Sequence, residues 1–247
     1  WDGGEWRDLQ SEDIPPTPSE NFNVVLYTGN GSTQSITGVG FKPDFVWVKV
    51  RSTTGSGPLA DSTRGTGKAV YSNLDSADYT FPAGQGVTSF DADGFSIGDD
   101  STGNGGYNGN GKTYVAWCWK ANGGTTSSNT DGTNITSSVQ VNAKAGFSIV
   151  QFTTPGTFSG SNTVGHGLGS TPDAIFVKRT DGVEDWYVYH QAAGLNKASR
   201  LNSTINYSNA TYLFGTVNST VFNPSFTGTA NQQVLAYCFR SIAGYSK

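Results

Sequence analysis

The chain has 247 residues, of which 14% are charged, and its formal net charge is −4. Its Lys and Arg residues are scattered rather than gathered in a basic stripe, so we expect no nucleic-acid partner. No run approaches the roughly 18 apolar residues of a membrane-spanning helix, so we expect no membrane insertion. The 33 Gly and 9 Pro residues leave little room for long helices, and the composition predicts an all-β protein.

The first 20 residues differ from the rest of the chain. They carry six acidic residues against one arginine, Arg7, and include the proline-rich run 14–18. Such a composition is typical of an extended segment. Two interpretations stay open: a linker from a preceding domain, or an arm that lies on a neighbouring subunit. In the second interpretation, Trp1, Trp6 and Ile14 are the anchoring side chains.

Three blocks of sequence occur twice, in the same order. Residues 21–28 (NFNVVLYT) return as 146–153 (GFSIVQFT), 42–49 (KPDFVWVK) as 171–178 (TPDAIFVK), and 113–120 (TYVAWCWK) as 233–240 (QVLAYCFR). This pattern predicts a duplicated module of about a hundred residues, the usual size of one domain. The predicted organisation is an acidic arm (1–20), a first module (21–123), a Gly/Ser/Thr-rich linker that is flexible or lies along the surface (124–144), and a second module (145–247).

Short β-branched and aromatic runs between turn residues predict strands in both modules. In the first module they cover residues 24–28, 45–51, 68–72, 87–89, 95–98 and 114–120. In the second they cover 147–153, 174–179, 186–191, 212–215 and 234–240. The number and spacing of these strands predict two tandem β-sandwiches, for which a jelly roll is one possible arrangement.

The predicted strand 114–120 is apolar on both faces, which is typical of a central strand. One face carries Val115, Trp117 and Trp119, and we expect these side chains to fill the core of the sandwich. The opposite face is mostly small and is expected to meet another element closely. Cys118 and its counterpart Cys238 belong to different modules, so we expect two buried, unreactive thiols rather than a disulfide or a metal pair.

Two segments match known catalytic or nucleotide-binding patterns without the context that these patterns need. Residues 106–113 fit the phosphate-loop pattern GxxxxGK[ST], and residues 94–98 fit the nucleophile-elbow pattern GxSxG. Both require a helix after the motif, whereas an aromatic strand and an Asp/Ser/Gly loop follow here. Outside the arm the only Glu is Glu184, so a glycosidase would have to use aspartates. We expect a protein that is not an enzyme and has no cofactor, with a polysaccharide-degrading enzyme as the weakest alternative.

Four aspartates lie close together in the sequence of the first module. They are Asp91, Asp93, Asp99 and Asp100. Carboxylate oxygens suit Ca²⁺, but the twelve-residue calcium-loop pattern is absent because Thr102 stands where a Glu is expected. We therefore expect ordinary Asp/Gly turns and no metal, with these four residues as the only metal candidates.

Several aromatic residues lie in or beside the segments that differ between the two modules. Trp186, Tyr187, Tyr189, Tyr207 and Tyr107 are of this kind. Exposed rings beside Asn, Asp and Ser would suit a sugar, which needs apolar stacking together with hydrogen bonds. The sequence therefore proposes Trp186, Tyr187, Tyr189 and Tyr107 as ligand-binding residues, with burial in the core as the alternative.

Several sequence segments of the chain, together, resemble those of a family of structural proteins from marine tailed phages, especially cyanophage-type viruses. The resemblance is carried by the segments 27–31 (YTGNG), 40–49 (GFKPDFVWVK), 90–98 (FDADGFSIG), 113–124 (TYVAWCWKANGG), 164–169 (VGHGLG), 186–190 (WYVYH), 236–239 (AYCF) and 244–247 (GYSK). It extends from about residue 21 to the end, and residues 1–20 do not share it. It implies a virion location and no catalytic residue.

From the residues and this resemblance we expect a virion structural protein on the outside of a tail or capsid. The favoured role is a tail fibre or surface appendage that attaches to the host by many weak sites, with a host-surface glycan as ligand. The alternative is a capsid decoration or tail accessory protein that cements neighbouring subunits. Other virion proteins and further copies of the chain, as a homo-oligomer, are the expected partners.

Overall fold

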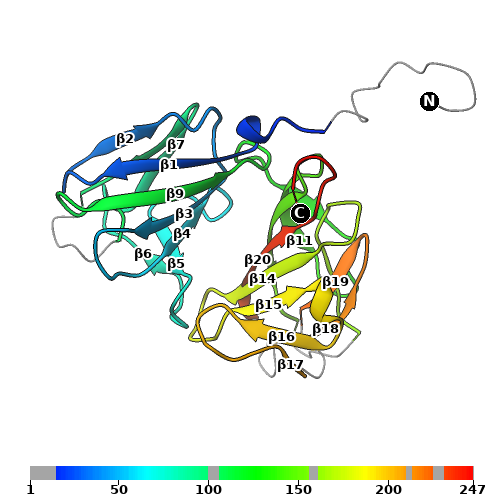
Figure 1. The fold of residues 1–247 in the computed structure, drawn as a ribbon. Helices are drawn as coiled ribbons and strands as arrows, with labels where there is room; N and C mark the ends of the chain where they lie inside the picture. The colour runs from blue at the N-terminus through cyan, green and yellow to red at the C-terminus, as the bar shows by residue number, and fades with distance from the viewer. Residues whose placement is uncertain (1–14, 100–105, 156–160, 210–212, 225–230, 247) are drawn as a thin grey trace, which may run out of the picture.

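The computed structural model describes residues 15–99, 106–155, 161–209, 213–224 and 231–246, and this part of the chain is an all-β protein with antiparallel sheets (Figure 1). Its helical pieces are two single 3₁₀ turns, Pro18–Glu20 (η1) and Gln191–Ala193 (η2). No helix in the described ranges has the length and apolar character that a membrane crossing requires. Trp1, Trp6 and Ile14, the predicted anchors of the arm, lie outside the described residues.

The first module consists of two antiparallel sheets that pack face to face. The six-stranded sheet has the order β1-β9-β3-β4-β5-β6, with bounds Phe22–Thr28 (β1), Thr113–Trp119 (β9), Phe45–Val50 (β3), Pro58–Asp61 (β4), Lys68–Tyr71 (β5) and Tyr79–Thr80 (β6). The three-stranded sheet has the order β2-β8-β7, with bounds Gln34–Thr37 (β2), Gly94–Ile97 (β8) and Val87–Asp91 (β7). The predicted strands 87–89 and 95–98 are present as β7 and β8, which pair as an antiparallel hairpin.

The second module repeats this two-sheet arrangement. Its larger sheet has the order β10-β11-β12-β20-β14-β15-β16-β17, with bounds Ser127–Asn129 (β10), Ser137–Asn142 (β11), Phe147–Thr153 (β12), Gln233–Phe239 (β20), Ala174–Arg179 (β14), Tyr187–His190 (β15), Lys197–Arg200 (β16) and Ser208–Asn209 (β17). Its smaller sheet has the order β13-β19-β18, with bounds Val164–Gly165 (β13), Val221–Pro224 (β19) and Leu213–Val217 (β18).

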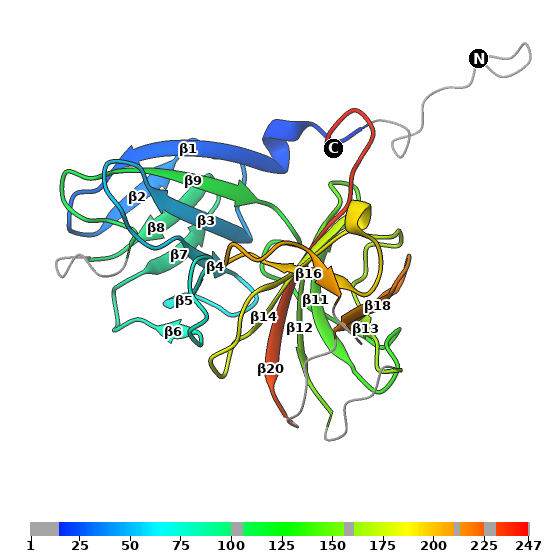
Figure 2. The same cartoon turned by 60° about the horizontal axis from the view of Figure 1, so that its bottom comes forward.

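Apart from β10 and β11, the larger sheets of the two modules have the same strand order. β12, β20 and β14 correspond to β1, β9 and β3, and β15, β16 and β17 correspond to β4, β5 and β6. The register agrees as well, because Phe22 pairs with Trp119 and Phe147 pairs with Phe239. The two modules lie side by side in both views (Figures 1 and 2). An origin of this likeness by internal duplication remains a prediction.

Each module has its own apolar core between its two sheets, and β9 shows which face of a central strand points into that core. Tyr114, Ala116 and Cys118 point into the first core, together with Phe95 and Val87 from the smaller sheet. The expectation that the aromatic face of β9 fills this core is therefore wrong. The small residues face inward because large side chains from the opposite sheet occupy the space.

The two cysteines lie in different cores, as predicted. Cys118 belongs to the first core and Cys238 to the second, and both are buried, free thiols. Burial raises the pKa of each thiol to about 12.

Part of the predicted linker, residues 124–144, forms strands in the larger sheet of the second module. Residues 127–129 form β10, and β11 pairs with β12 from end to end. Val139 is buried in the second core and Val141 packs against it. The prediction was wrong because two valines at alternate positions suffice to bury one face of a strand that is otherwise polar.

Candidate functional site

The aromatic outer faces of the two larger sheets pack against each other and form a third apolar cluster. Its buried members are Phe45, Leu59, Val70 and Ala121 from the first module and Phe147, Ile149, Trp186, Leu235 and Tyr237 from the second. The ring centroid of Phe45 lies 4.2 Å from that of Tyr237 and 5.9 Å from that of Phe147. Trp119, which was expected in a sandwich core, packs against this cluster at the contact between the two modules.

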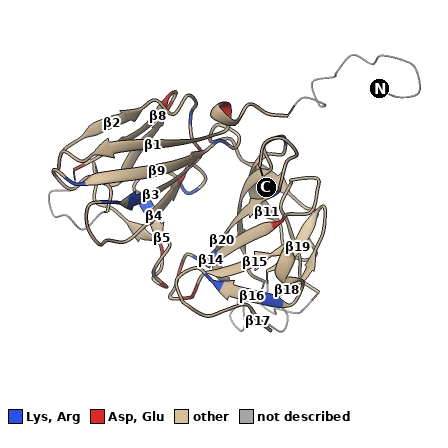
Figure 3. Ribbon diagram, viewed as in Figure 1, with Lys and Arg blue, Asp and Glu red and all other residues tan. Residues whose placement is uncertain are grey.

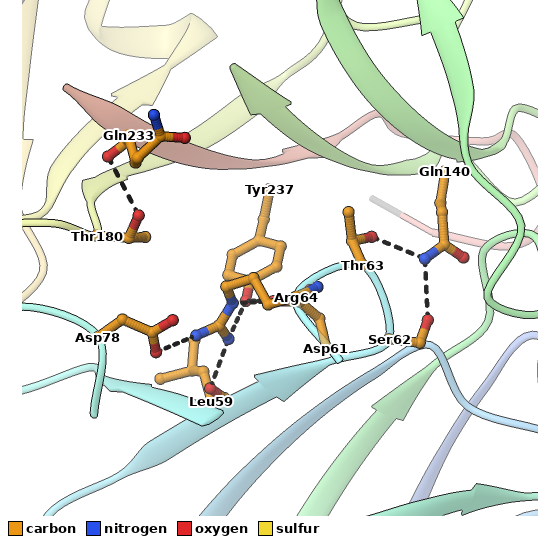
Figure 4. Close-up of polar contacts among 10 residues, drawn as sticks. All are labelled: Leu59, Asp61, Ser62, Thr63, Arg64, Asp78, Gln140, Thr180, Gln233 and Tyr237. Carbon is orange, nitrogen blue, oxygen red and sulfur yellow. Dashed lines mark hydrogen bonds and ion pairs between the residues drawn. The ribbon is translucent and has the colours of Figure 1, made fainter. Parts of the chain in front are cut away.

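A buried ion-pair network lies beside this cluster (Figure 4). The Arg64 guanidinium contacts Asp61 at 2.6 Å and Asp78 at 2.7 Å, and it donates to the carbonyl oxygen of Leu59 at 2.9 Å. The Tyr237 hydroxyl of the second module donates to the Asp61 carboxylate at 2.8 Å. Burial alone would lower the pKa of Arg64, but the carboxylates of Asp61 and Asp78 outweigh it and raise this pKa above its ordinary value.

Gln140, a buried residue of β11, connects the second module to the loop after β4. Its amide Nε2 donates to Ser62 Oγ at 3.0 Å and to Thr63 Oγ1 at 2.7 Å (Figure 4). Its Oε1 accepts from the backbone N–H of Gly124 at 3.0 Å. The side chain is therefore satisfied on both sides of the junction, as a buried amide must be.

Lys178 of β14 makes a second polar connection between the modules. Its buried ammonium group donates to the carbonyl oxygen of Asp75 in the first module at 3.1 Å. It also donates to the carbonyl oxygens of Arg179 and Glu184 in the second module, each at 2.8 Å. Burial lowers the pKa of Lys178 to about 8. Together with the aromatic cluster, these contacts hold the two modules in one fixed arrangement.

A cavity of about 540 Å³ lies at one end of this junction. Its lining residues are Pro18, Phe22, Trp119, Ala145, Gly146, Phe147, Asp173, Ala174, His190, Phe239, Arg240, Ser241, Tyr245 and Ser246. Both modules and both ends of the described chain contribute, and the C-terminal turn lies near η1 in Figure 2. We call this site the junction cavity.

Four aromatic rings from register-paired positions of the two sheets line the junction cavity. Phe22 pairs with Trp119, and Phe147 pairs with Phe239. The ring centroid of Trp119 lies 4.9 Å from that of Phe22 and 5.9 Å from that of Phe239, so the rings of the two modules meet at Trp119. The four rings come from β1, β9, β12 and β20, which are regular strands, and so their positions are fixed by sheet geometry.

The cavity is open because one position differs between the modules. Phe45 pairs with Trp119 in the first sheet, and Ala174 pairs with Phe239 at the corresponding position of the second sheet. The Phe45 ring fills its space with contacts to Trp119 and Tyr237. The methyl group of Ala174 lines the cavity instead and leaves room for a ligand.

Polar groups stand among the apolar lining of the cavity. His190 Nδ1 accepts a hydrogen bond from the backbone N–H of Ala192 at 3.2 Å, so its Nε2 carries the proton of the neutral ring and can donate. Asp173 Oδ2 accepts from the backbone N–H of Ser241 at 2.6 Å. The Arg240 guanidinium has no hydrogen bond or ion pair with any described residue. Donors, an acceptor and ring faces therefore converge on one cavity.

The predicted ligand-binding aromatics are placed differently from the expectation. Trp186 is fully buried at the junction, Tyr189 is 3% exposed in the second core, and Tyr107 is 1% exposed in the first core. Their exposure was wrongly predicted because each ring packs on another aromatic side chain of the fold, namely Trp186 on Tyr237, Tyr189 on Phe214 and Tyr107 on Phe81. Tyr187 is half-buried, its hydroxyl donates to Glu184 at 2.8 Å, and the Arg200 guanidinium lies over its ring.

The aspartates of the first module take part in local hydrogen bonds. Asp93 accepts from the backbone N–H groups of Gly40 and Gly38, and these bonds lower the pKa of Asp93. Asp91 accepts from the hydroxyls of Ser89 and Ser96, each at 2.7 Å. Asp100 lies outside the described residues. Within the described part of the chain, no three His, Cys, Asp or Glu residues are grouped as metal ligands would be.

Sequence reasoning missed the residues of the junction cavity. Phe22 was noted only as part of a repeated block and Phe147 only as a strand residue, and Arg240 had no assigned role. His190, noted only within segment 186–190, is exposed and lines the cavity. One signal was available in the repeated blocks, since block 42–49 has Phe45 where block 171–178 has Ala174. A large residue in one copy and a small one in the other indicates a space that only one copy fills.

The chain belongs to a family described as a domain of unknown function (DUF7483), whose profile matches residues 17–247. No curated protein and no solved structure matches the chain.

Proposed function

We propose that this member of the DUF7483 family is a structural protein of a phage virion that binds a glycan in the junction cavity and has no catalytic activity. The observation that carries the proposal is the cavity itself, which presents aromatic rings and polar groups in one place. The virion location rests on the resemblance of the sequence to virion proteins of marine tailed phages. Attachment to the host surface is the role that this combination favours.

The lining of the cavity has the chemistry that a sugar ring requires. One face of a sugar ring carries C–H groups that stack on an aromatic ring, and its hydroxyls need hydrogen-bonding partners. Trp119 and Phe22 are partly exposed and supply ring faces. His190, Asp173 and Arg240 supply polar groups beside them. The volume of about 540 Å³ falls within the range of small-ligand sites and fits a mono- or disaccharide unit of a longer chain.

The rigidity of the junction favours binding without catalysis. Its rings are held by strands, and the two modules are fixed by the Tyr237–Asp61, Gln140 and Lys178 contacts. A preorganised cavity loses little conformational entropy when a ligand binds. One such cavity per chain gives weak binding, and several copies on one particle convert it into firm attachment.

A glycan array carrying bacterial surface polysaccharides tests the proposal, with binding of the full chain as the readout. Ala174→Phe is the decisive variant, because it fills the cavity without removing a contact. Ala83→Phe, at an exposed loop position of the first module, is the matched control. We expect the wild type and Ala83→Phe to bind the same polysaccharides and Ala174→Phe to lose at least tenfold in affinity. Equal binding by all three proteins would overturn the proposed site.

A further inference from the structure

The outer face of the first larger sheet is only partly covered by the second module. Strand register places three rows of side chains on this face, namely Phe22–Trp119–Phe45, Val24–Trp117–Trp47 and Leu26–Val115–Lys49. The first row lies in the junction and its cavity. The second and third rows continue the same face, with Trp47 still packed against the junction cluster, and we call these two rows the open face.

The open face is apolar and exposed. Val24 is 42% exposed and Leu26 is 63% exposed, and they stand beside the partly exposed side chains of Trp117 and Val115. Trp117 contacts Trp47 edge to face, with ring centroids 5.9 Å apart. Neither β1 nor β9 has a charged residue, and both strands are free of red and blue in Figure 3. A contiguous apolar surface of this kind indicates an interface.

In the second module, the corresponding sheet face is buried against the first module. Ile149 of β12 holds the position that corresponds to Val24 of β1, and Ile149 is completely buried by the first module. Leu235, on the neighbouring strand, is completely buried as well. The same type of face is thus covered by a sheet of the other module in one case and left open in the other.

Pairing of another strand with the edge of β1 fits less well than packing on its face. The odd-numbered residues of β1 bond to β9, as the flanking pairs Asn21 with Lys120 and Gly29 with Lys112 show, so the even-numbered backbone groups point to the free edge. Asn23 Oδ1 already accepts from the N–H of Val24 at 2.8 Å. The Gln34 side chain donates to the carbonyl oxygen of Thr28 at 3.2 Å. These side chains occupy groups that an added strand would need.

We propose that the open face is an interface with a second copy of this chain, in which the two first modules pack face to face about a twofold axis. The outer sheet face of the second module has the same apolar character as the open face, and it is already covered by the first module. The open face of a second copy is the remaining surface of this type. The interface adjoins the junction on the same sheet face of each first module, so the first module of the partner lies next to the chain's own second module.

A twofold contact places each apolar row near an equivalent row of the partner. Leu26 and Val24 then become buried, and Lys49 lies at the border of the interface, where its ammonium group already donates to the carbonyl oxygen of Gly55. The inference is independent of glycan binding, since Val24 and Leu26 do not line the junction cavity.

Sedimentation velocity of the full chain over a range of concentrations tests the proposal. We expect a dimer for the wild type and a dimer constant at least tenfold weaker for Leu26→Glu, because the variant buries a charge in an apolar interface. Val183→Glu is the matched control, since Val183 is 70% exposed and lies outside the open face, and it should dimerise like the wild type. Circular dichroism of the variants checks that each one is folded. A wild type that stays monomeric at all concentrations, or a Leu26→Glu variant that dimerises like the wild type, would overturn the inference.

Discussion

The rings of Phe45 and Tyr237 belong to different modules, yet they stack with centroids 4.2 Å apart and planes inclined by 27°. Tyr237 also donates its hydroxyl to Asp61, so one side chain contributes apolar and polar contacts to the same junction. This pairing explains why the central strands β9 and β20 are apolar on both faces. One face of each strand belongs to the core of its own module, and the other face belongs to the contact between modules.

Removal of the Arg64 charge should destabilise the whole chain. Arg64→Met leaves the buried carboxylate of Asp61 without its ionic partner, and breaking a buried pair in this way costs about 3–5 kcal/mol. Urea unfolding followed by tryptophan fluorescence gives the free energy of unfolding. Arg179→Met is a suitable control, because the Arg179–Asp181 pair is partly exposed and should contribute less than about 1 kcal/mol. A loss for Arg64→Met no larger than that of the control would contradict the structure.

Trp186 should contribute to the stability of the fold rather than to ligand binding. Trp186→Ala removes a fully buried side chain and its hydrogen bond to Tyr71, which should cost about 3–5 kcal/mol of unfolding free energy. Tyr207→Ala, at a residue that is 40% exposed, should change stability by less than about 1 kcal/mol. Thermal unfolding of the two variants separates the outcomes. A Trp186→Ala protein with wild-type stability would place the indole outside the junction.

The pH dependence of stability should reveal the buried ammonium group of Lys178. Its pKa is lowered to about 8, whereas an unfolded lysine has a pKa of about 10.4. Below pH 8 both states are protonated and the cost of burying the charge is present in full. Between these two values the unfolded state binds more protons, so the contribution of Lys178 to stability rises with pH, by an amount on the order of 3 kcal/mol.

Comparison with Lys178→Met isolates this contribution, because the tyrosines and cysteines titrate in both proteins. The difference in unfolding free energy, wild type minus variant, should be constant below about pH 7.5 and should increase between about pH 8 and 10. Urea unfolding at a series of pH values measures it. A difference that stays flat across this range would show that the lysine is not held in a desolvated site.

The two thiols should resist modification in the folded protein. Burial raises the pKa of Cys118 and Cys238 to about 12, so at pH 8 neither forms the thiolate that reacts with thiol reagents. With a colorimetric disulfide reagent we expect no reaction in buffer and two equivalents in denaturant. Fast reaction of one thiol in buffer would mean that its core opens readily.

The sequence predicted the strands with strong local patterns. Residues 147–153 and 174–179 were predicted as strands and form β12 and β14 with the same bounds. β4 (Pro58–Asp61) was missed, although all four of its residues are buried, because its burial depends on the junction and on the pairing of Asp61 with Arg64. Alternation within a strand shows that two faces are apolar, but it does not reveal which partner covers each face.

The candidate site was harder to predict than the fold. Phe22 and Trp119 lie nearly a hundred positions apart in the sequence, and Phe239 follows more than a hundred positions after Trp119. Only the placement of one module on the other brings the ring of Phe239 to that of Trp119. Aromatics near variable loops looked exposed, but Trp186 and Tyr107 are buried by contacts that the sequence does not display. The difference between Phe45 and Ala174 is visible in the sequence. That it leaves a cavity open follows only from the packing of the two modules.

Saturation-transfer-difference NMR of the full chain with a bound bacterial glycan fragment tests the central claim most directly. If the junction cavity is the binding site, magnetisation transfers from the protein to the sugar in the wild type and in Ala83→Phe, and it disappears in Ala174→Phe. The strongest transfer should reach the C–H face of the sugar that stacks on Trp119. Undiminished transfer in a folded Ala174→Phe protein would contradict the account and place glycan binding elsewhere on the chain.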